Sequence, residues 1–193
     1  MGGDLLEAFA ALEAAFSDVA KRVQDDAWQL AETDVVDLTR RLHTMTCQAQ
    51  GVQLRLVREV DSRSIPASLG ATSLRAWISG AMRLSPREAK AMDKLARSLH
   101  EKCTDTGAAL GNGGVNYEQA AAISRIIEGL PSKATYEATR WAEGFLLEHA
   151  RVLNAEDLAK LSKRIDSAID PDGTLDREKV ANERRSANIR DKP

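Results

Sequence analysis

The chain has few of the residues that hold small secreted or metal-stabilised domains together. Its 193 residues include only two cysteines, Cys47 and Cys103, which lack the paired spacing of a zinc site. We therefore expect both to be buried free thiols. Aromatic residues make up only 4% of the chain, while Ala and Leu dominate the 43% that is apolar. This composition favours helix packing over sheets, and it predicts an all-α fold, a multi-helix bundle of about seven helices.

Long apolar runs are also missing from the sequence. Nowhere are there 18 consecutive apolar residues, and no cationic segment at the N-terminus leads into an apolar stretch. The sequence thus predicts a soluble, cytoplasmic protein without membrane contact. A chain of this length can bury a sizeable core as one domain with an appended segment.

Catalytic motifs are absent as well. The Gly111–Gly114 stretch lacks the Lys-Ser/Thr of a phosphate-binding loop, and no serine stands in a G-x-S-x-G elbow. The histidines are isolated from one another, and the Asp170–Gly173 sequence Asp-Pro-Asp-Gly is typical of a turn closing a helix rather than a Ca²⁺ loop. We expect no enzymatic activity, no metal, no cofactor and no small-molecule substrate.

Charge is distributed unevenly along the chain, although the net charge is only −2. Residues 1–31 carry two basic and six acidic side chains, for a net charge of −4. Residues 62–102 carry eight basic and three acidic side chains, for a net charge of +5. Any surface for nucleic acid should therefore lie in the middle of the chain.

Two heptad patterns occupy residues 1–62. The first runs from Leu5 to Val23, and the second contains the seam positions Val35, Leu38, Leu42, Met45, Ala49, Val52 and Leu56. Two long helices separated by a few residues predict an antiparallel hairpin, with the seams buried inside a bundle. A coiled-coil homodimer fits the same spacing, so both alternatives remain open.

Residues 73–101 predict a helix-turn-helix-like pair inside a helical domain that spans residues 63–173. The second helix has a clear start, because Ser85 can cap it, Pro86 suits the first helical position and Glu88 completes a capping box. A conventional pair often has glycine in the turn, where this chain has Arg83.

The second helix of this pair is apolar on one side and basic on the other. Arg87, Lys90, Lys94 and Arg97 share the basic side at 100° per residue, and Arg75 and Arg83 lie near the turn. Phosphates and guanine edges are contacted mainly by Arg and Lys, so these six residues are the candidate nucleic-acid contacts. A basic helix face that is merely solvated has the same pattern.

Further helices follow the Gly111–Gly114 break. Asn116 can cap one of them, Ser132 the next over about 133–152, and Asn154 a third that carries inward Leu158, Leu161, Ile165 and Ile169. Residues 174–193 hold six basic and four acidic side chains and form a predicted charged C-terminal tail.

Several blocks of the sequence resemble the actinobacterial family grouped as domain of unknown function 222, also called the 13E12 repeat family. The resemblance covers roughly residues 30–173, and the order and spacing of the blocks carry it. The matching blocks are Gly70–Ser73 with Ala76 and Trp77, Arg83–Ser85 with Glu88, Ala89, Leu95 and Ala96, Gly114–Asn116 with Gln119, Ala120 and Ile123, Leu130–Pro131, and Asp170–Gly173.

The resemblance implies a protein of actinobacteria or their phages, in which this helical region often precedes an HNH nuclease domain. An HNH site needs clustered His, Asn or Asp residues around one metal ion, whereas His43, His100 and His149 stand apart. The nuclease is thus expected to be absent from this chain. The chain is then the N-terminal region of a longer protein, a truncated relative or a stand-alone member.

Two classes of function remain after these exclusions. The first is a non-catalytic, DNA-associated helical module, the targeting region of an HNH-endonuclease-type protein. The alternative is an oligomerisation or protein-interaction scaffold that uses the heptad seams and makes no DNA contact.

Overall fold

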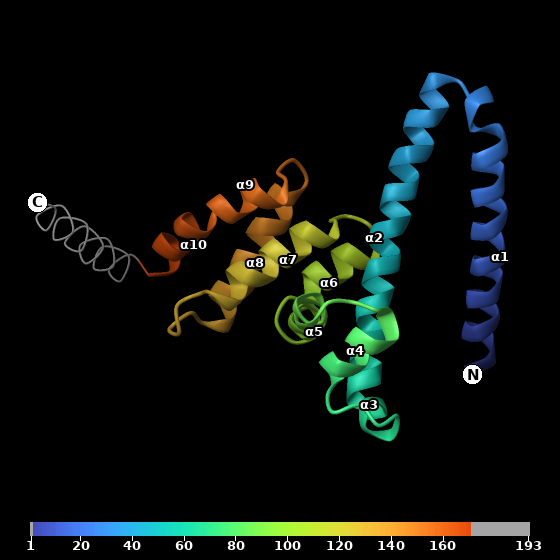
Figure 1. Ribbon diagram of the computed structural model, residues 1–193. Helices are drawn as coiled ribbons and strands as arrows, with labels where there is room; N and C mark the ends of the chain where they lie inside the picture. The colour runs from blue at the N-terminus through green and yellow to red at the C-terminus, as the bar shows by residue number, and fades with distance from the viewer. Residues whose placement is uncertain (1, 171–193) are drawn as a thin grey trace, which may run out of the picture. The chain divides into compact units, whose positions relative to one another are not determined.

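The computed structural model describes residues 2–170, and every regular element among them is helical (Figure 1). The predicted all-α fold is therefore confirmed. The predicted tail at 174–193 and the end of the Asp170–Gly173 turn lie outside the described residues. In order, the helices are α1 (Gly2–Asp26), the 3₁₀ helix η1 (Ala27–Gln29), α2 (Glu32–Ser62), α3 (Ile65–Ser68), α4 (Leu74–Met82), α5 (Pro86–Glu101), α6 (Thr104–Gly111), α7 (Tyr117–Glu128), α8 (Tyr136–Ala150), α9 (Ala155–Lys160) and α10 (Ser162–Ile169).

The chain divides into two compact units, 1–43 and 44–193, and the division falls inside α2. We call them the hairpin unit and the compact unit. The sequence predicts a later boundary, after residue 62. The division is earlier because the second half of α2 packs into the core of the compact unit through Cys47, Leu54 and Val57, which are all buried.

The hairpin unit contains α1, η1 and the start of α2, and the chain reverses direction between the two long helices. Its apolar side chains are not enclosed. Along α2, the large residues of the predicted seam are 42–48% exposed in both units, namely Val35, Leu38, Leu42, Met45, Val52 and Leu56, and Ala49 is exposed as well. A closed internal bundle would have buried these residues, so the described part of the chain leaves its seams open to solvent.

The compact unit has a continuous hydrophobic core. Its largest fully buried apolar side chains come from six different helices and include Ile78, Leu110, Ile123, Leu146, Leu158 and Ile165. Helix α2 also approaches α6 closely, because a Cβ atom on Gly51 would lie 2.9 Å from the Cα atom of Gly111. The absence of a side chain at Gly51 permits this contact.

Side-chain caps fix most of the helix starts in the compact unit. Asn116 accepts a hydrogen bond from the Gln119 backbone N–H, and the Gln119 side chain accepts one from the Asn116 N–H, so α7 begins with a full capping box. Helix α8 begins three residues later than predicted. Thr135, not Ser132, caps it by accepting from the Ala138 N–H. Asn154 caps α9 as predicted.

Candidate functional site

Helices α4 and α5 lie where the sequence predicts a helix-turn-helix-like pair. Ser73 caps α4, and Ser85 with Glu88 forms the predicted capping box at the start of α5. Between them, Arg83 ends α4 in the left-handed conformation with φ of 54°. The Ser79 hydroxyl donates to the Leu84 carbonyl oxygen at 2.7 Å and ties the turn to α4. The turn therefore adopts a glycine-like geometry without a glycine.

The N-terminus of α5 already has an anionic cap. Hydrogen bonds from the side chain and backbone of Ser85 hold the pKa of Glu88 below its ordinary value. A carboxylate at this position satisfies a free N–H and the positive end of the helix dipole. An anionic ligand on this pair would therefore be held by cationic side chains rather than by the helix N-terminus.

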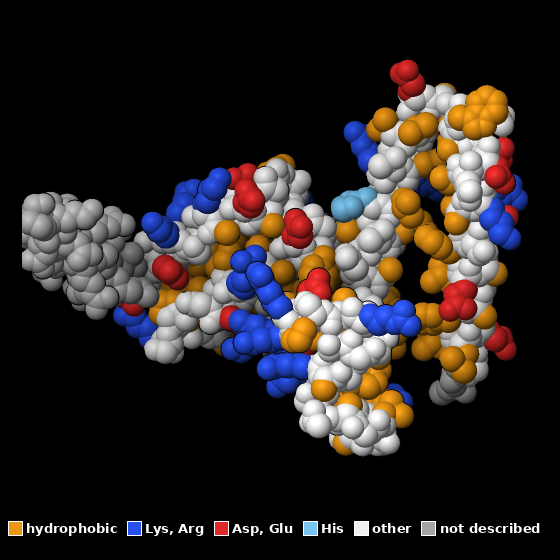
Figure 2. All heavy atoms as spheres, viewed as in Figure 1, with side chains coloured by type: hydrophobic (Ala, Val, Ile, Leu, Met, Phe, Trp, Pro, Cys, Tyr) orange, Lys and Arg blue, Asp and Glu red, His pale blue; other side chains and the backbone are white. Residues whose placement is uncertain are grey.

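The two predicted faces of α5 are confirmed. The apolar positions are buried in the core, namely Ala89, Met92, Leu95, Ala96 and Leu99. The four basic residues of the opposite side are all exposed, namely Arg87, Lys90, Lys94 and Arg97. Lys and Arg side chains gather over α4 and α5 in the space-filling view (Figure 2).

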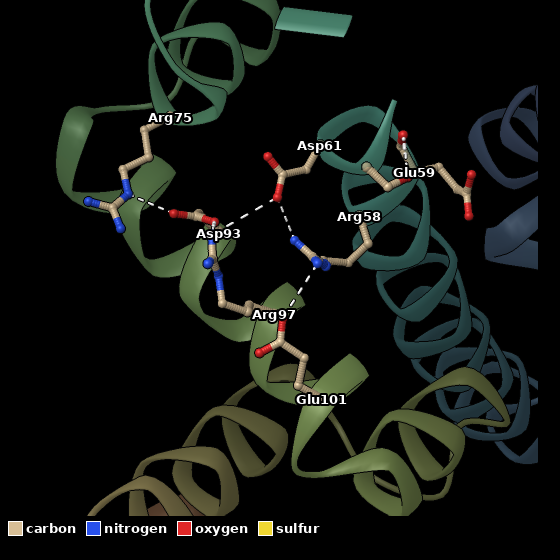
Figure 3. Close-up of polar contacts among 8 residues, drawn as sticks. Arg58, Glu59, Asp61, Arg75, Asp93, Arg97 and Glu101 are labelled. Atoms are coloured by element: carbon tan, nitrogen blue, oxygen red, sulfur yellow. Dashed lines mark hydrogen bonds and ion pairs between the residues drawn. The ribbon is translucent and has the colours of Figure 1, made fainter. Parts of the chain in front are cut away.

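Helix α5 also carries a buried acid, Asp93, which was not predicted as part of the site from the sequence. The Asp93 side chain is 4% exposed and accepts a hydrogen bond from Arg75 Nε at 2.7 Å. Its other oxygen lies 3.5 Å from a terminal nitrogen of Arg97. Figure 3 shows Asp93 between these two arginines, one from α4 and one from its own helix. Asp93 thus neutralises part of the predicted basic surface.

Arg97 also belongs to a longer chain of charges that reaches α2. It lies 4.0 Å from Asp61, which accepts from Arg58 at 2.6 Å, and Arg58 in turn reaches Glu101 at 3.5 Å (Figure 3). The Arg58 side chain is mostly buried. Because these groups connect α2 with the second half of α5, the network positions α5 within the compact unit.

Lys94 is the third of the six candidate residues that has an acidic partner. Its ammonium group contacts the carboxylate of Glu128 at the end of α7. Arg75, Lys94 and Arg97 are therefore engaged within the protein.

The remaining three candidates have no such partner. Within residues 2–170, no carboxylate lies within 4.0 Å of the cationic group of Arg83, Arg87 or Lys90, and all three residues are exposed. They lie at the turn and in the first part of α5. We call these three residues the free basic set.

Only part of this pairing has a signal in the sequence. Asp93 stands four residues before Arg97, a spacing that predicts an ion pair on a helix. The pairing of Arg75 with Asp93 and of Lys94 with Glu128 depends on how separate helices pack, which no local pattern specifies.

The other potentially reactive side chains of the compact unit are buried or make contacts that stabilise the fold. Both cysteines are buried thiols, as predicted, and burial raises the pKa of each. His149 contacts the Phe145 carbonyl oxygen through Nδ1 at 2.8 Å and packs on the Phe145 ring. The fully buried Glu143 accepts from the backbone N–H and the hydroxyl of Thr106 at 2.7 and 2.8 Å, which caps the first turn of α6.

Metal-binding and membrane-spanning features are both absent from the described residues. No group of three or more His, Cys, Asp or Glu side chains between residues 2 and 170 is arranged to hold a metal ion. Over the same range, no helix combines the length and the apolar character needed to cross a bilayer.

Comparison with known proteins gives a single result. Neither the curated proteins nor the solved structures contain a significant match to the chain. The family model described as domain of unknown function (DUF222) matches residues 36–192, which is most of the sequence and includes the whole α4–α5 pair. On this match, the chain belongs to the DUF222 family.

Proposed function

We propose that this chain is a non-catalytic DNA-associated module that contacts duplex DNA through the free basic set on α4 and α5. The supporting observation is the position of Arg83, Arg87 and Lys90, which reach the surface without an acidic partner in the described chain. In helix-turn-helix proteins the N-terminal residues of the second helix contact base edges, and the first helix crosses the DNA backbone. Arg87 and Lys90 occupy that part of α5.

The proposal assigns different roles to the six basic residues. The free basic set makes the phosphate and base contacts. Arg75, Lys94 and Arg97 keep α5 in place through Asp93, Glu128 and Asp61, and they contribute little to binding while those pairs persist. In a longer relative that carries an HNH domain, such a module would bring the nuclease to DNA.

Salt-dependent binding to a random-sequence duplex, followed by fluorescence anisotropy, tests this assignment. We expect Arg87→Ala with Lys90→Ala to lower the slope of log K against log salt by about 2, one for each lost phosphate contact. Lys163→Ala with Arg164→Ala is the matched control, because both residues are cations on α10, outside the α4–α5 pair. An unchanged slope in the first variant, or an equal loss in both, contradicts the proposal.

A substitution at Asp93 tests the same assignment in the opposite direction. Asp93→Asn removes the negative charge that faces Arg75 and Arg97 and keeps a similar shape. Both guanidinium groups are then available to phosphates, so duplex affinity should rise and the salt slope should increase by up to about 2. Weaker binding by a folded Asp93→Asn variant would show that these arginines act only through Asp93.

A further inference from the structure

The hairpin unit has no interior of its own. Between residues 3 and 43 every side chain is exposed except Ala27, which is half-buried. Yet α1 carries a regular seam of large apolar residues, each 36–58% exposed: Leu5, Phe9, Leu12, Phe16, Val19 and Val23. Exposed apolar surface on this scale is typical of a protein interaction site.

Helix α2 carries apolar residues on two opposite sides. Cys47, Gly51 and Leu54 face the core of the compact unit and are buried. At 100° per residue, the exposed positions Val52 and Leu56 lie on the other side of the same helix. The exposed seam of α2 is therefore additional to its core face, and the compact unit does not account for it.

The seams match an antiparallel hairpin in register. Within the hairpin unit, Val23 and Leu38 are equally distant in sequence from the Leu30–Ala31 junction, and so are Val19 and Leu42. Two antiparallel helices can cover each other's seam from one side only. The remaining exposure, 42–53% for these four residues, is what a two-helix hairpin leaves open.

We propose that two copies of this chain pair through their hairpin units and form a four-helix bundle. The nine large seam residues of the hairpin unit, six on α1 together with Val35, Leu38 and Leu42, expose on the order of 800 Å² of apolar surface, close to the ~800 Å² that one partner contributes to a standard interface. A symmetric dimer places the same surface on both sides of the contact, so one seam pattern suffices for both partners. This inference does not depend on DNA binding.

The flanks of the α1 seam suit such close packing. Three of the six heptad positions beside the seam hold small residues, Ala8, Ala15 and Ala20, and the other three hold Leu6, Glu13 and Arg22, while Asp4 and Asp18 lie away from it. Residues 1–43 nonetheless carry nine acidic and four basic side chains, a net charge of −5 for each copy. Because salt screens this repulsion, the dimer should become tighter as salt rises, the reverse of DNA binding.

Sedimentation of the full chain across a concentration series up to about 100 µM tests the proposal, since a dimer at this size of interface should assemble within that range. We expect a monomer–dimer equilibrium that shifts toward dimer with added salt. Phe16→Glu places a charge in the seam of both copies and should raise the dissociation constant by at least about 100-fold.

A control variant and a stability measurement accompany the sedimentation experiment. Ala14→Glu adds the same charge to α1 outside the seam, and it should leave the dimer within about threefold of the wild type. Urea unfolding of the compact unit should be unchanged in Phe16→Glu, which shows that loss of dimer is not loss of folding. A wild-type monomer at every concentration, or a dimer that Phe16→Glu leaves intact, overturns the proposal. Those results would point to a different partner for the seam.

Discussion

Residues 3–43 and residues 44–170 both contain amphipathic helices with similar apolar spacing. The two units differ in how far the apolar faces of these helices are buried. In the compact unit, short helices meet from several directions, and residues such as Ile123 and Leu146 have no exposed surface. In the hairpin unit, α1 is 25 residues long and buries none of its seam completely. The spacing of apolar residues thus predicts which face of a helix is apolar, but not whether the same chain covers it.

Removing a large core side chain from the compact unit should have the largest effect. Ile123→Ala deletes a fully buried side chain of α7, so we expect the free energy of unfolding to fall by about 2–5 kcal/mol. Urea denaturation monitored by circular dichroism measures it. A loss under about 1 kcal/mol would mean that the core is much looser than its burial indicates.

Alkaline pH should weaken the compact unit through a buried thiol. Burial raises the pKa of Cys103 from 9.0 to about 11. Because the folded pKa is the higher one, this contribution to stability is fully present below pH 9 and is lost as the pH rises toward 11. The loss amounts to roughly 2 kcal/mol. Unfolding measured from about pH 8 to 11 should show it, and Cys103→Ala should flatten that part of the curve. An equally steep curve in the variant would assign the effect to another group.

Two glycines in helices should respond in opposite ways to the same substitution. Gly51→Ala places a Cβ atom against the backbone of Gly111, and overpacking should outweigh the gain in helix propensity for a net loss of about 1 kcal/mol. A Cβ atom added to Gly144 in α8 would meet nothing within 4 Å, so Gly144→Ala should stabilise by about 0.5–1 kcal/mol. Thermal unfolding of both variants measures the difference, and stabilisation by both would show that α2 and α6 can separate.

The smallest expected effect belongs to the hairpin unit. Leu12→Ala truncates an exposed seam residue, so at low protein concentration the free energy of unfolding should stay within about 0.5 kcal/mol of the wild type. At concentrations where the proposed dimer forms, the same variant should be less stable. A large loss in the dilute protein would show that the hairpin unit has an interior after all.

The start of several helices could be predicted because the signals are local. Ser85 with Glu88, and Asn116, form caps within four residues of sequence, and the structure contains these caps. The prediction at Ser132 was wrong because Pro131 and Ala134 close a turn through their backbones, which delays the cap to Thr135. The expected single helix after Asn154 is divided at Leu161, although Leu158 and Ile165 are buried as predicted.

The candidate site was predicted less completely than the fold. The basic side of α5 follows from helix periodicity, and its exposure is confirmed. Which cations remain without partners depends on Asp61 and Glu128, which reach α5 from α2 and α7. Such pairs arise from packing between helices that are distant in sequence, so the free basic set became visible only in the structure.

The left-handed backbone conformation of Arg83 sets the stability of this turn against its positive charge. A non-glycine residue at φ of 54° carries a conformational cost of about 1 kcal/mol that glycine avoids. Arg83→Gly would therefore relax the turn and at the same time delete a cation of the free basic set. If Arg83→Gly raises the free energy of unfolding and weakens DNA binding, the arginine charge favours binding at the expense of stability.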